Sequence, residues 1–278
     1  GVDILIPKKV FDTKVESLRP ILLFEVDCNQ NNKRLGRTVM QMAEAQHGLA
    51  DEQYGSRKHH SAAEQALNKR LTFDILRLGK QNAIDTAVDL RSNYDLVIHS
   101  SASVALQRQG MPEQPIVCMF TTLQDMTHTI RTAYGDSDTT WGGQDIWAFP
   151  FDHPPQGLGQ GNGAAPAIWA LVSTPVLHML WKQGFGAAFK LAISGKEIHL
   201  VGCTFVDDSD IIQTAVIGDT NIDKVFEQAQ AGLNTFVGRM KATGGQVRPD
   251  KCNYYKIEFV WRNDKWKYAK KAPGDREL

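Results

Sequence analysis

Two adjacent aspartates, Asp207 and Asp208, follow an apolar and β-prone run of the chain at residues 198–205. A second β-prone run, at residues 211–217, comes soon after them. This order predicts a strand, an acidic turn and a second strand. Because side chains alternate along a strand, the two carboxylates point to opposite sides, so that one can bind a metal while the other supports it. A solvated hairpin tip would give the same local pattern.

A third carboxylate, Asp89, ends another β-like run at residues 83–89, where the chain turns toward a helix. Carboxylates at the ends of neighbouring strands can hold two Mg²⁺ ions roughly 3.5–4 Å apart. Their hard oxygen atoms are the ligands that Mg²⁺ prefers. The eight histidines are scattered and none stands beside these aspartates, so we interpret them as core or surface residues.

Cations accompany two short β-like runs near the start of the chain. Lys8 and Lys9 follow the first run, and Arg19 lies in the second. The two runs predict a β-ribbon that can close over a triphosphate, since arginine gives bidentate contacts and lysine a point charge. Exposed charges on an edge hairpin are the alternative interpretation.

A loop at residues 52–58 places an aromatic ring, a glycine and cations side by side. These are Tyr54, Gly55, Arg57 and Lys58. The mixture suits a nucleic-acid backbone with a base stacked nearby. An ordinary turn is the alternative.

Glycines are concentrated at residues 157–163, directly after Gln156. Glycine density lets a backbone pass close to a ligand, and Pro166 fits the first turn of a helix that runs to about residue 181. A dinucleotide fingerprint needs a preceding strand and a fixed glycine spacing, and neither is convincing in this chain. We therefore interpret the loop as a cradle for a nucleotide and its templating base.

Apolar periodicity predicts helices in several other stretches. These are residues 29–49, 61–78, 97–109, 112–134 and 223–242, and residues 254–261 are predicted as a strand. On the helix at 61–78, the pattern places Leu67, Leu71 and Ile75 on the buried face. It leaves Lys69 and Arg77 on the face in water.

Composition sets broader limits. The 278 residues are enough for one large domain or two small ones. No run of about eighteen apolar residues occurs, so no membrane span is expected. The chain has no initiator Met and no secretory signal, from which we expect a fragment. The four cysteines stand far apart without paired metal-ligand spacing, so we expect free thiols in a reducing, intracellular compartment, either cytoplasm or nucleus.

Charge is balanced overall but unevenly distributed. Residues 1–80 and 241–278 carry an excess of Lys and Arg, whereas residues 81–240 carry an excess of Asp and Glu. Basic flanks around an acidic centre suit a polyanion held outside and metal ions held inside. Simple surface variation is the alternative.

In this order the motifs resemble the fingers and palm of a reverse transcriptase of the kind encoded by retroelements. The run 205–208 is similar to the aromatic-x-Asp-Asp turn of that family, and residues 89–95 are similar to its first metal motif. Further segments resemble the fingertip strands, the template-contacting turn, the nucleotide segment and the closing palm motif. These are residues 6–9 with 18–21, 53–57, 155–166 and 243–252.

The resemblance implies roles for matching positions. Asp89 and Asp207 would bind both metals with help from the Leu90 carbonyl, and Asp208 would lie near the primer end and the metals. Lys251 would protonate pyrophosphate. The other implied contacts are Tyr94 as the steric gate against a 2′-hydroxyl, Gln156 and Gly157 on the incoming nucleotide, Lys8, Lys9 and Arg19 on its triphosphate, and Tyr54, Arg57 and Lys58 on the template.

We therefore expect an α+β right-hand polymerase core, with an antiparallel palm sheet, packed helices and an absent or truncated thumb. The expected domains are fingers at 1–80, palm at 81–111, a connection at 112–150 and palm again at 151–278. The expected activity is RNA-templated DNA synthesis with two Mg²⁺ ions, or Mn²⁺ in their place. Its partners would be an RNA template, a DNA or RNA primer, dNTPs, and a thumb or other domains of a longer polyprotein.

Two alternatives stay open. An RNA-directed RNA polymerase shares the palm chemistry, although the bulky Tyr94 argues against ribonucleotides. A non-catalytic nucleic-acid-binding descendant of a reverse transcriptase is the other, and the three intact aspartates argue against it. Asn93 also departs from the small residue or cysteine that many relatives have at that position, so the pocket beside Tyr94 can differ.

Overall fold

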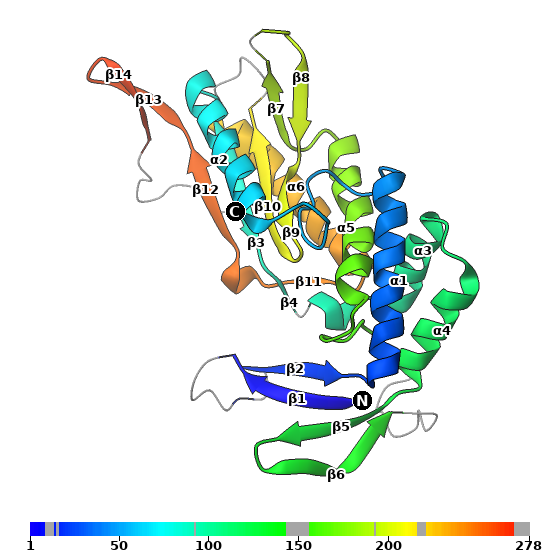
Figure 1. The fold of residues 1–278 in the computed structure, drawn as a ribbon. Coiled ribbons are helices and arrows are strands. Elements are labelled where there is room, and N and C mark those ends of the chain that lie inside the picture. The colour runs from blue at the N-terminus through cyan, green and yellow to red at the C-terminus, as the bar shows by residue number, and fades with distance from the viewer. Residues whose placement is uncertain are drawn as a thin grey trace. The chain divides into compact units, whose positions relative to one another are not determined.

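A computed structural model describes residues 1–8, 14, 17–91, 93–142, 156–191, 193–215 and 221–269. The chain divides into two compact units (Figure 1). Unit 1 comprises Gly1–Gly48 and Ser92–Val172, and unit 2 comprises Leu49–Arg91 and Ser173–Leu278. The expected combination of helices with largely antiparallel sheets is confirmed. The expected fingers and palm boundaries divide the chain by function and stay a prediction.

Unit 1 contains a four-stranded sheet with the order β2-β1-β5-β6. The predicted ribbon is confirmed, because β1 (Val2–Pro7) and β2 (Leu18–Leu23) pair antiparallel. β5 (Thr127–Thr132) runs parallel to β1 and pairs antiparallel with β6 (Gly135–Gly142). Lys9 lies outside the described residues.

The described helices that lie wholly within unit 1 are α1 (Val26–Ala45), the 3-10 helix η2 (Asn93–Leu96), α3 (His99–Arg108) and α4 (Glu113–Gln124). The predicted helix at 112–134 was wrong in its second half, because residues 127–132 form β5. Alternating threonines favour an extended chain there, and pairing with strands on both sides satisfies its backbone. None of the described helices combines the length and apolarity that a bilayer crossing requires.

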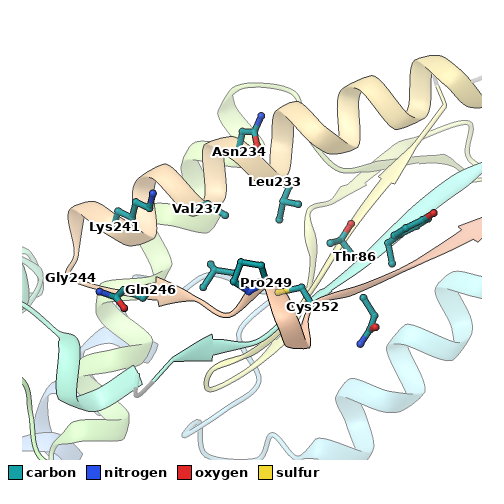
Figure 2. A pocket seen from close by; sticks show the side chains of 13 residues that line it. Thr86, Leu233, Asn234, Val237, Lys241, Gly244, Gln246, Pro249 and Cys252 are labelled. Atoms are coloured by element: carbon teal, nitrogen blue, oxygen red, sulfur yellow. The ribbon is translucent and has the colours of Figure 1, made fainter. Parts of the chain in front are cut away.

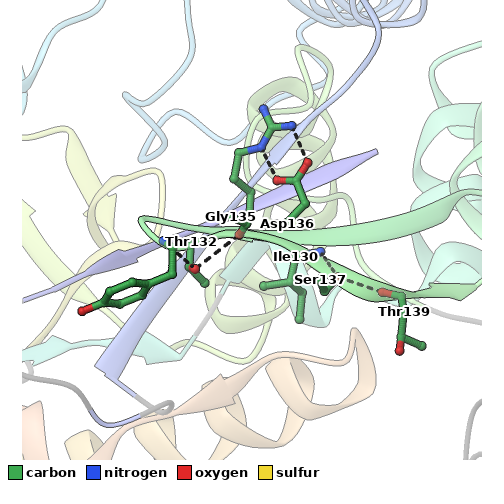
Figure 3. A network of polar contacts seen from close by, with 8 residues as sticks. Ile130, Thr132, Gly135, Asp136, Ser137 and Thr139 are labelled. Atoms are coloured by element: carbon green, nitrogen blue, oxygen red, sulfur yellow. Dashed lines mark hydrogen bonds and ion pairs between the residues drawn. The ribbon is translucent and has the colours of Figure 1, made fainter.

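The hairpin of β5 and β6 is closed by its own polar side chains (Figure 3). Arg131 donates two hydrogen bonds to the Asp136 carboxylate, at 2.6 and 2.8 Å. The Ser137 hydroxyl accepts from the Ile130 amide at 3.2 Å. These contacts replace backbone pairs at the point where the register shifts between Thr129 and Arg131.

Unit 2 is built on a second four-stranded sheet with the order β12-β3-β10-β9. Its strands are β3 (Ala83–Val88), β9 (Gly202–Phe205), β10 (Asp208–Thr214) and β12 (Asn253–Ile257). The predicted strand, acidic turn and strand are confirmed as β9 and β10. The described part of unit 2 also has three small ribbons: β4 (Leu90–Arg91) with β11 (Gln246–Val247), β7 (Ala187–Lys190) with β8 (Glu197–Leu200), and β13 (Phe259–Arg262) with β14 (Lys265–Tyr268).

Each face of this sheet has its own apolar cluster. α6 (Ile222–Ala242) contributes Val225, Phe226 and Ala229, which pack against Ile84 of β3. On the other face, Leu76 of α2 (Ala62–Gly79) packs with side chains of the sheet and of β7, namely Ala83, Ile212, Ile257, Ala187 and Phe189. The two central strands, β3 and β10, are therefore largely buried on both sides.

The orientation predicted for α2 was wrong, although its extent was predicted well. Leu67, Leu71 and Ile75 are 56%, 48% and 46% exposed. Lys69, expected in water, instead forms ion pairs with two carboxylates of the sheet. The helix begins as predicted, since the Ser61 hydroxyl accepts from the Glu64 amide at 3.2 Å.

The loop before α2 covers the free edge of β9. The Thr204 amide donates to the Glu52 carbonyl at 2.8 Å, and the Tyr54 amide donates to the Thr204 carbonyl at 2.9 Å. Covering an edge in this way prevents pairing with other chains. It also fixes residues 52–54 beside the strand that leads into the acidic turn.

The remaining long helix, α5 (Ala165–Lys182), begins one residue before Pro166, as the sequence predicts. After β14 the described chain ends at Ala269, and no helical thumb occurs among the described residues.

Candidate active site

The register of two strands places two of the predicted carboxylates, Asp89 and Asp208, at the same end of a sheet in unit 2. β3 and β10 pair antiparallel, and the last pair is Val88 with Ser209. Asp89 directly follows Val88 in the chain, and Asp208 directly precedes Ser209. Both residues therefore lie at the same end of this strand pair.

Residues 243–252, here called the closing segment, lie against the same end of β3. The Arg248 amide donates to the Asp89 carbonyl at 2.9 Å, directly after β11 pairs with β4. The Lys251 ammonium lies 3.8 Å from the Asp89 carboxylate. The structure thus brings together two of the predicted catalytic side chains from segments that are far apart in sequence.

The donor set fits magnesium in chemistry. Among the described residues, no three or more His, Cys, Asp or Glu side chains form a cluster that could enclose a metal ion. Mg²⁺ does not need such a cage, because it is usually held by one or two carboxylates together with waters and substrate phosphates. Aspartates at two adjacent strand ends match this mode of binding.

The acidic turn contains a strained residue. Val206, between Phe205 and Asp207, has a φ of 59°, in the left-handed region. This conformation is uncommon for a β-branched side chain and costs roughly 1–3 kcal/mol. Surrounding contacts must therefore hold the turn that presents Asp207 and Asp208.

A buried ion cluster lies behind this turn, on the α2 side of the sheet. The Lys69 ammonium lies 2.8 Å from the Asp210 carboxylate and 3.1 Å from that of Asp85. Asp85 is fully buried, and no hydrogen bond within the described chain reaches its carboxylate apart from this ion pair. Burial raises the pKa of Asp85 to about 6, although the nearby Lys69 charge opposes the shift.

Predicted nucleotide-binding residues meet within unit 1. The Leu158 amide donates to the Tyr94 carbonyl at 2.7 Å. The Gln156 side-chain oxygen accepts from the His99 amide at 2.7 Å. Gly157 has a φ of 98°, and a Cβ there would lie 2.4 Å from the Asp95 carbonyl oxygen. The glycine is therefore required for the loop to lie against the segment that carries Tyr94.

The buried side chain of His99 holds this loop by a hydrogen bond. Its Nε2 lies 2.6 Å from the Gly157 carbonyl oxygen and its Nδ1 lies 3.0 Å from the Gln124 amide nitrogen. The ring packs on Phe120 at 4.6 Å between centroids. Burial lowers the pKa of His99, so the neutral ring donates from Nε2 and accepts at Nδ1. This is a core histidine, as the sequence indicated.

The fingertip ribbon contributes exposed cations. Lys8 follows β1, and Arg19 lies opposite Ile6 in β2. The Leu22 amide donates to the Gln160 carbonyl at 2.8 Å, which joins the ribbon to the glycine loop. Side chains of the ribbon, of η2 and of the loop line one cavity of about 150 Å³ in unit 1.

The predicted template loop is less exposed than its sequence suggests. Tyr54 is only 8% exposed, and its hydroxyl accepts from the Asn68 amide at 2.8 Å. Arg57 donates to the carbonyls of Ala50 and Gln53 at 3.2 and 3.1 Å. Lys58 is exposed. Tyr54 and Arg57 thus shape the loop in this structure, while Lys58 is available to a partner.

A family model described as "Reverse transcriptase (RNA-dependent DNA polymerase)" matches residues 6–269. This chain belongs to the reverse transcriptase family. Members of this family generally use divalent metal ions and bind a nucleic-acid template and primer. No curated protein matched the reverse transcriptase chain.

Solved telomerases share the fold of this reverse transcriptase chain, with a TM-score of 0.57 in each case. Candida albicans telomerase with a TWJ fragment of telomeric RNA is 12% identical over 92% of this chain and 41% of that chain. Apo telomerase from Candida tropicalis truncated from its C-terminal domain is 13% identical, over 95% of this chain and 51% of that chain. Apo telomerase from the same organism is 12% identical, over 92% of this chain and 44% of that chain. This chain therefore spans about half or less of each.

One feature of unit 2 of this reverse transcriptase chain was not anticipated from its sequence. In the ribbon of β13 and β14, Trp261 pairs with Trp266 and Phe259 with Tyr268, which puts four aromatic rings on one face. Arg262, Lys265 and Lys267 lie on the opposite face by strand alternation. Trp261, Trp266 and Tyr268 are 58%, 47% and 51% exposed. The alternation of aromatic and basic residues at 259–268 is the sequence pattern that could have predicted this two-faced ribbon.

A cavity of about 570 Å³ lies on the α6 side of the sheet (Figure 2). Leu233 and Val237 of α6 line one wall, and Val247, Pro249 and Cys252 of the closing segment line the other. Because β11 pairs with β4, this cavity borders the segment that holds Asp89.

The buried ion cluster predicts a pH dependence of folding. The pKa of Asp85 is about 6 in the folded chain and about 3.8 when unfolded, so the folded state binds the extra proton. The stability that this group contributes is complete below about pH 4 and is lost as the pH rises to about 6. As the pH rises through this window, we expect the free energy of unfolding of the wild type to fall by roughly 1–3 kcal/mol relative to that of Asp85→Asn.

Urea unfolding of both proteins from pH 4 to 7 measures that difference. A difference that stays constant with pH would contradict the raised pKa of Asp85.

Proposed function

We propose that this chain carries out RNA-templated DNA synthesis, adding deoxynucleotides to a primer 3′-hydroxyl. The observation that supports the proposal is the β3–β10 register, which brings Asp89 and the Asp207–Asp208 turn to the same end of one sheet in a chain of the reverse transcriptase family. Retroelement reverse transcriptases are the class whose motifs the sequence resembles.

The carboxylates of Asp89, Asp207 and Asp208 and the Leu90 carbonyl would hold two Mg²⁺ ions. Such ions lower the pKa of the primer hydroxyl and neutralise the triphosphate and the departing pyrophosphate. Lys251, whose ammonium lies 3.8 Å from the Asp89 carboxylate, would give a proton to that pyrophosphate. The chain's own part is to position these groups, and charge stabilisation in a fixed geometry accounts for most such catalysis.

The incoming nucleotide would contact unit 1. Lys8 and Arg19 supply positive charge for its triphosphate, with Lys9 as a further candidate. Gln156 and Gly157 would touch its sugar or base. Tyr94, which is hydrogen-bonded through its backbone to the same loop, would exclude a 2′-hydroxyl.

Nucleic acid would contact two parts of unit 2. Lys58 is the exposed cation of the predicted template loop. The aromatic face of the β13–β14 ribbon offers rings for base stacking, and its basic face offers charge for phosphates. Stacking of this kind is independent of sequence, as a polymerase requires.

Primer extension tests the proposed activity. With an RNA template, a DNA primer, Mg²⁺ and four dNTPs, we expect template-dependent extension that Asp207→Asn with Asp208→Asn abolishes, by about 10³-fold or more. If the wild type binds the primer–template without Mg²⁺-dependent extension, also when a thumb-bearing longer chain is used, the chain is a non-catalytic binder and the proposal fails.

Sugar selection separates the proposal from an RNA polymerase. We expect Tyr94→Val to raise ribonucleotide incorporation relative to deoxynucleotides by about 10- to 100-fold, because the bulky ring no longer meets the 2′-hydroxyl. Single-nucleotide kcat/KM values for dCTP and CTP measure the change. An unaltered ratio would remove Tyr94 from this role.

The aromatic ribbon makes a separate prediction. Trp261→Ala should weaken primer–template binding by about 1–3 kcal/mol, the value of one stacked base. Trp181→Ala is the matched control, because Trp181 is 53% exposed on α5. Fluorescence anisotropy with a labelled primer–template measures both. Equal affinities for the two variants would contradict a role for the ribbon.

A further inference from the structure

Gln53 is a fully buried side chain with a complete set of hydrogen bonds. Its Oε1 accepts from the amides of Val206 at 3.0 Å and Gly55 at 2.9 Å. Its Nε2 donates to the Val206 carbonyl at 3.3 Å and to the Ser173 hydroxyl at 3.4 Å. A glutamine amide has two donor hydrogens and two acceptor lone pairs, and all are used here.

Gln53 binds both backbone groups of one residue, Val206. That residue is the strained member of the acidic turn, with its φ of 59°. A strained conformation persists only where the surroundings fix it. Two hydrogen bonds from one rigid amide to the N–H and C=O of Val206 provide such a constraint.

The backbone around Gln53 is itself fixed beside the acidic turn. Gln53 forms an isolated parallel bridge with Thr204, two residues before Val206. Gly55 lies so close that a Cβ there would be 2.4 Å from the Val206 nitrogen. The loop therefore reaches the acidic turn by backbone contacts, and the Gln53 side chain needs no reorganisation to bind it.

We propose that Gln53 is a positioning residue, which holds the Val206 backbone in the conformation that presents Asp207 and Asp208. This inference rests on the proposed polymerase function for its effect on rate. Its effect on the turn itself is independent of activity.

The test compares Gln53→Met with Gln213→Met. Gln213 is also buried, on β10, and its side chain makes hydrogen bonds with the Gly186 amide and the Thr214 carbonyl. The control therefore removes a similar buried amide away from the turn. We expect Gln53→Met to lower kcat for primer extension by about 10- to 100-fold, with KM for dNTP within about twofold, and Gln213→Met to retain the wild-type kcat.

Restoration by a second substitution tests the reason for the loss. Glycine adopts a positive φ without strain. With Val206→Gly, the turn should therefore depend less on the hydrogen bonds from Gln53. We expect Gln53→Met with Val206→Gly to recover at least about tenfold of the lost kcat, a coupling that additive effects exclude. A strictly additive double variant would overturn the proposal.

Hydrogen exchange gives the readout that does not depend on catalysis. Peptides that cover residues 203–210 should exchange about tenfold faster in Gln53→Met than in Gln213→Met. Unchanged exchange in this peptide overturns the positioning role. If the wild type shows no extension, also within a thumb-bearing longer chain, but the exchange difference is present, the polymerase proposal fails while the role of Gln53 in the turn stands.

Discussion

The antiparallel pairing of β3 with β10 is the constraint on which the rest of this structure depends. It brings Asp89 and Asp208 to the same end of the sheet, although 119 positions separate them in sequence. Side chains alternate along a strand, so a slip of one residue would turn every side chain of β10 to the opposite face. Burial on both faces, under α2 and α6, makes such a slip costly. The same pairing lets β12 and β9 join at the two sides.

Charge and strain are concentrated around that pairing. The Lys69 cluster places two carboxylates and an ammonium where apolar side chains of similar size would pack at least as stably. Val206 has a left-handed backbone conformation in the turn between β9 and β10. Both features oppose stability, and both adjoin the predicted metal carboxylates. This is the distribution expected when a fold gives up local stability to fix a functional geometry.

Local sequence patterns predicted much of this fold. The strands around Asp207, the extent of α2 and the start of α5 all follow from short-range rules. The inward face of α2 did not, because Lys69 pairs with aspartates on strands that only the tertiary fold brings near. Gln53 was missed for the same reason: its partners, Val206 and Ser173, are remote in sequence. The motifs gave the candidate carboxylates, but not the register that joins them.

Manganese EPR with primer–template and a non-hydrolysable dNTP tests the central claim most directly. The account predicts two Mn²⁺ ions per chain with a dipolar-coupled spectrum, consistent with a separation of roughly 3.5–4 Å. Asp89→Asn and Asp207→Asn should each abolish the coupled signal, while the matched surface change Asp136→Asn should leave it intact. A coupled pair that survives in Asp89→Asn, or no pair in a complex that binds nucleic acid and nucleotide, would contradict the account.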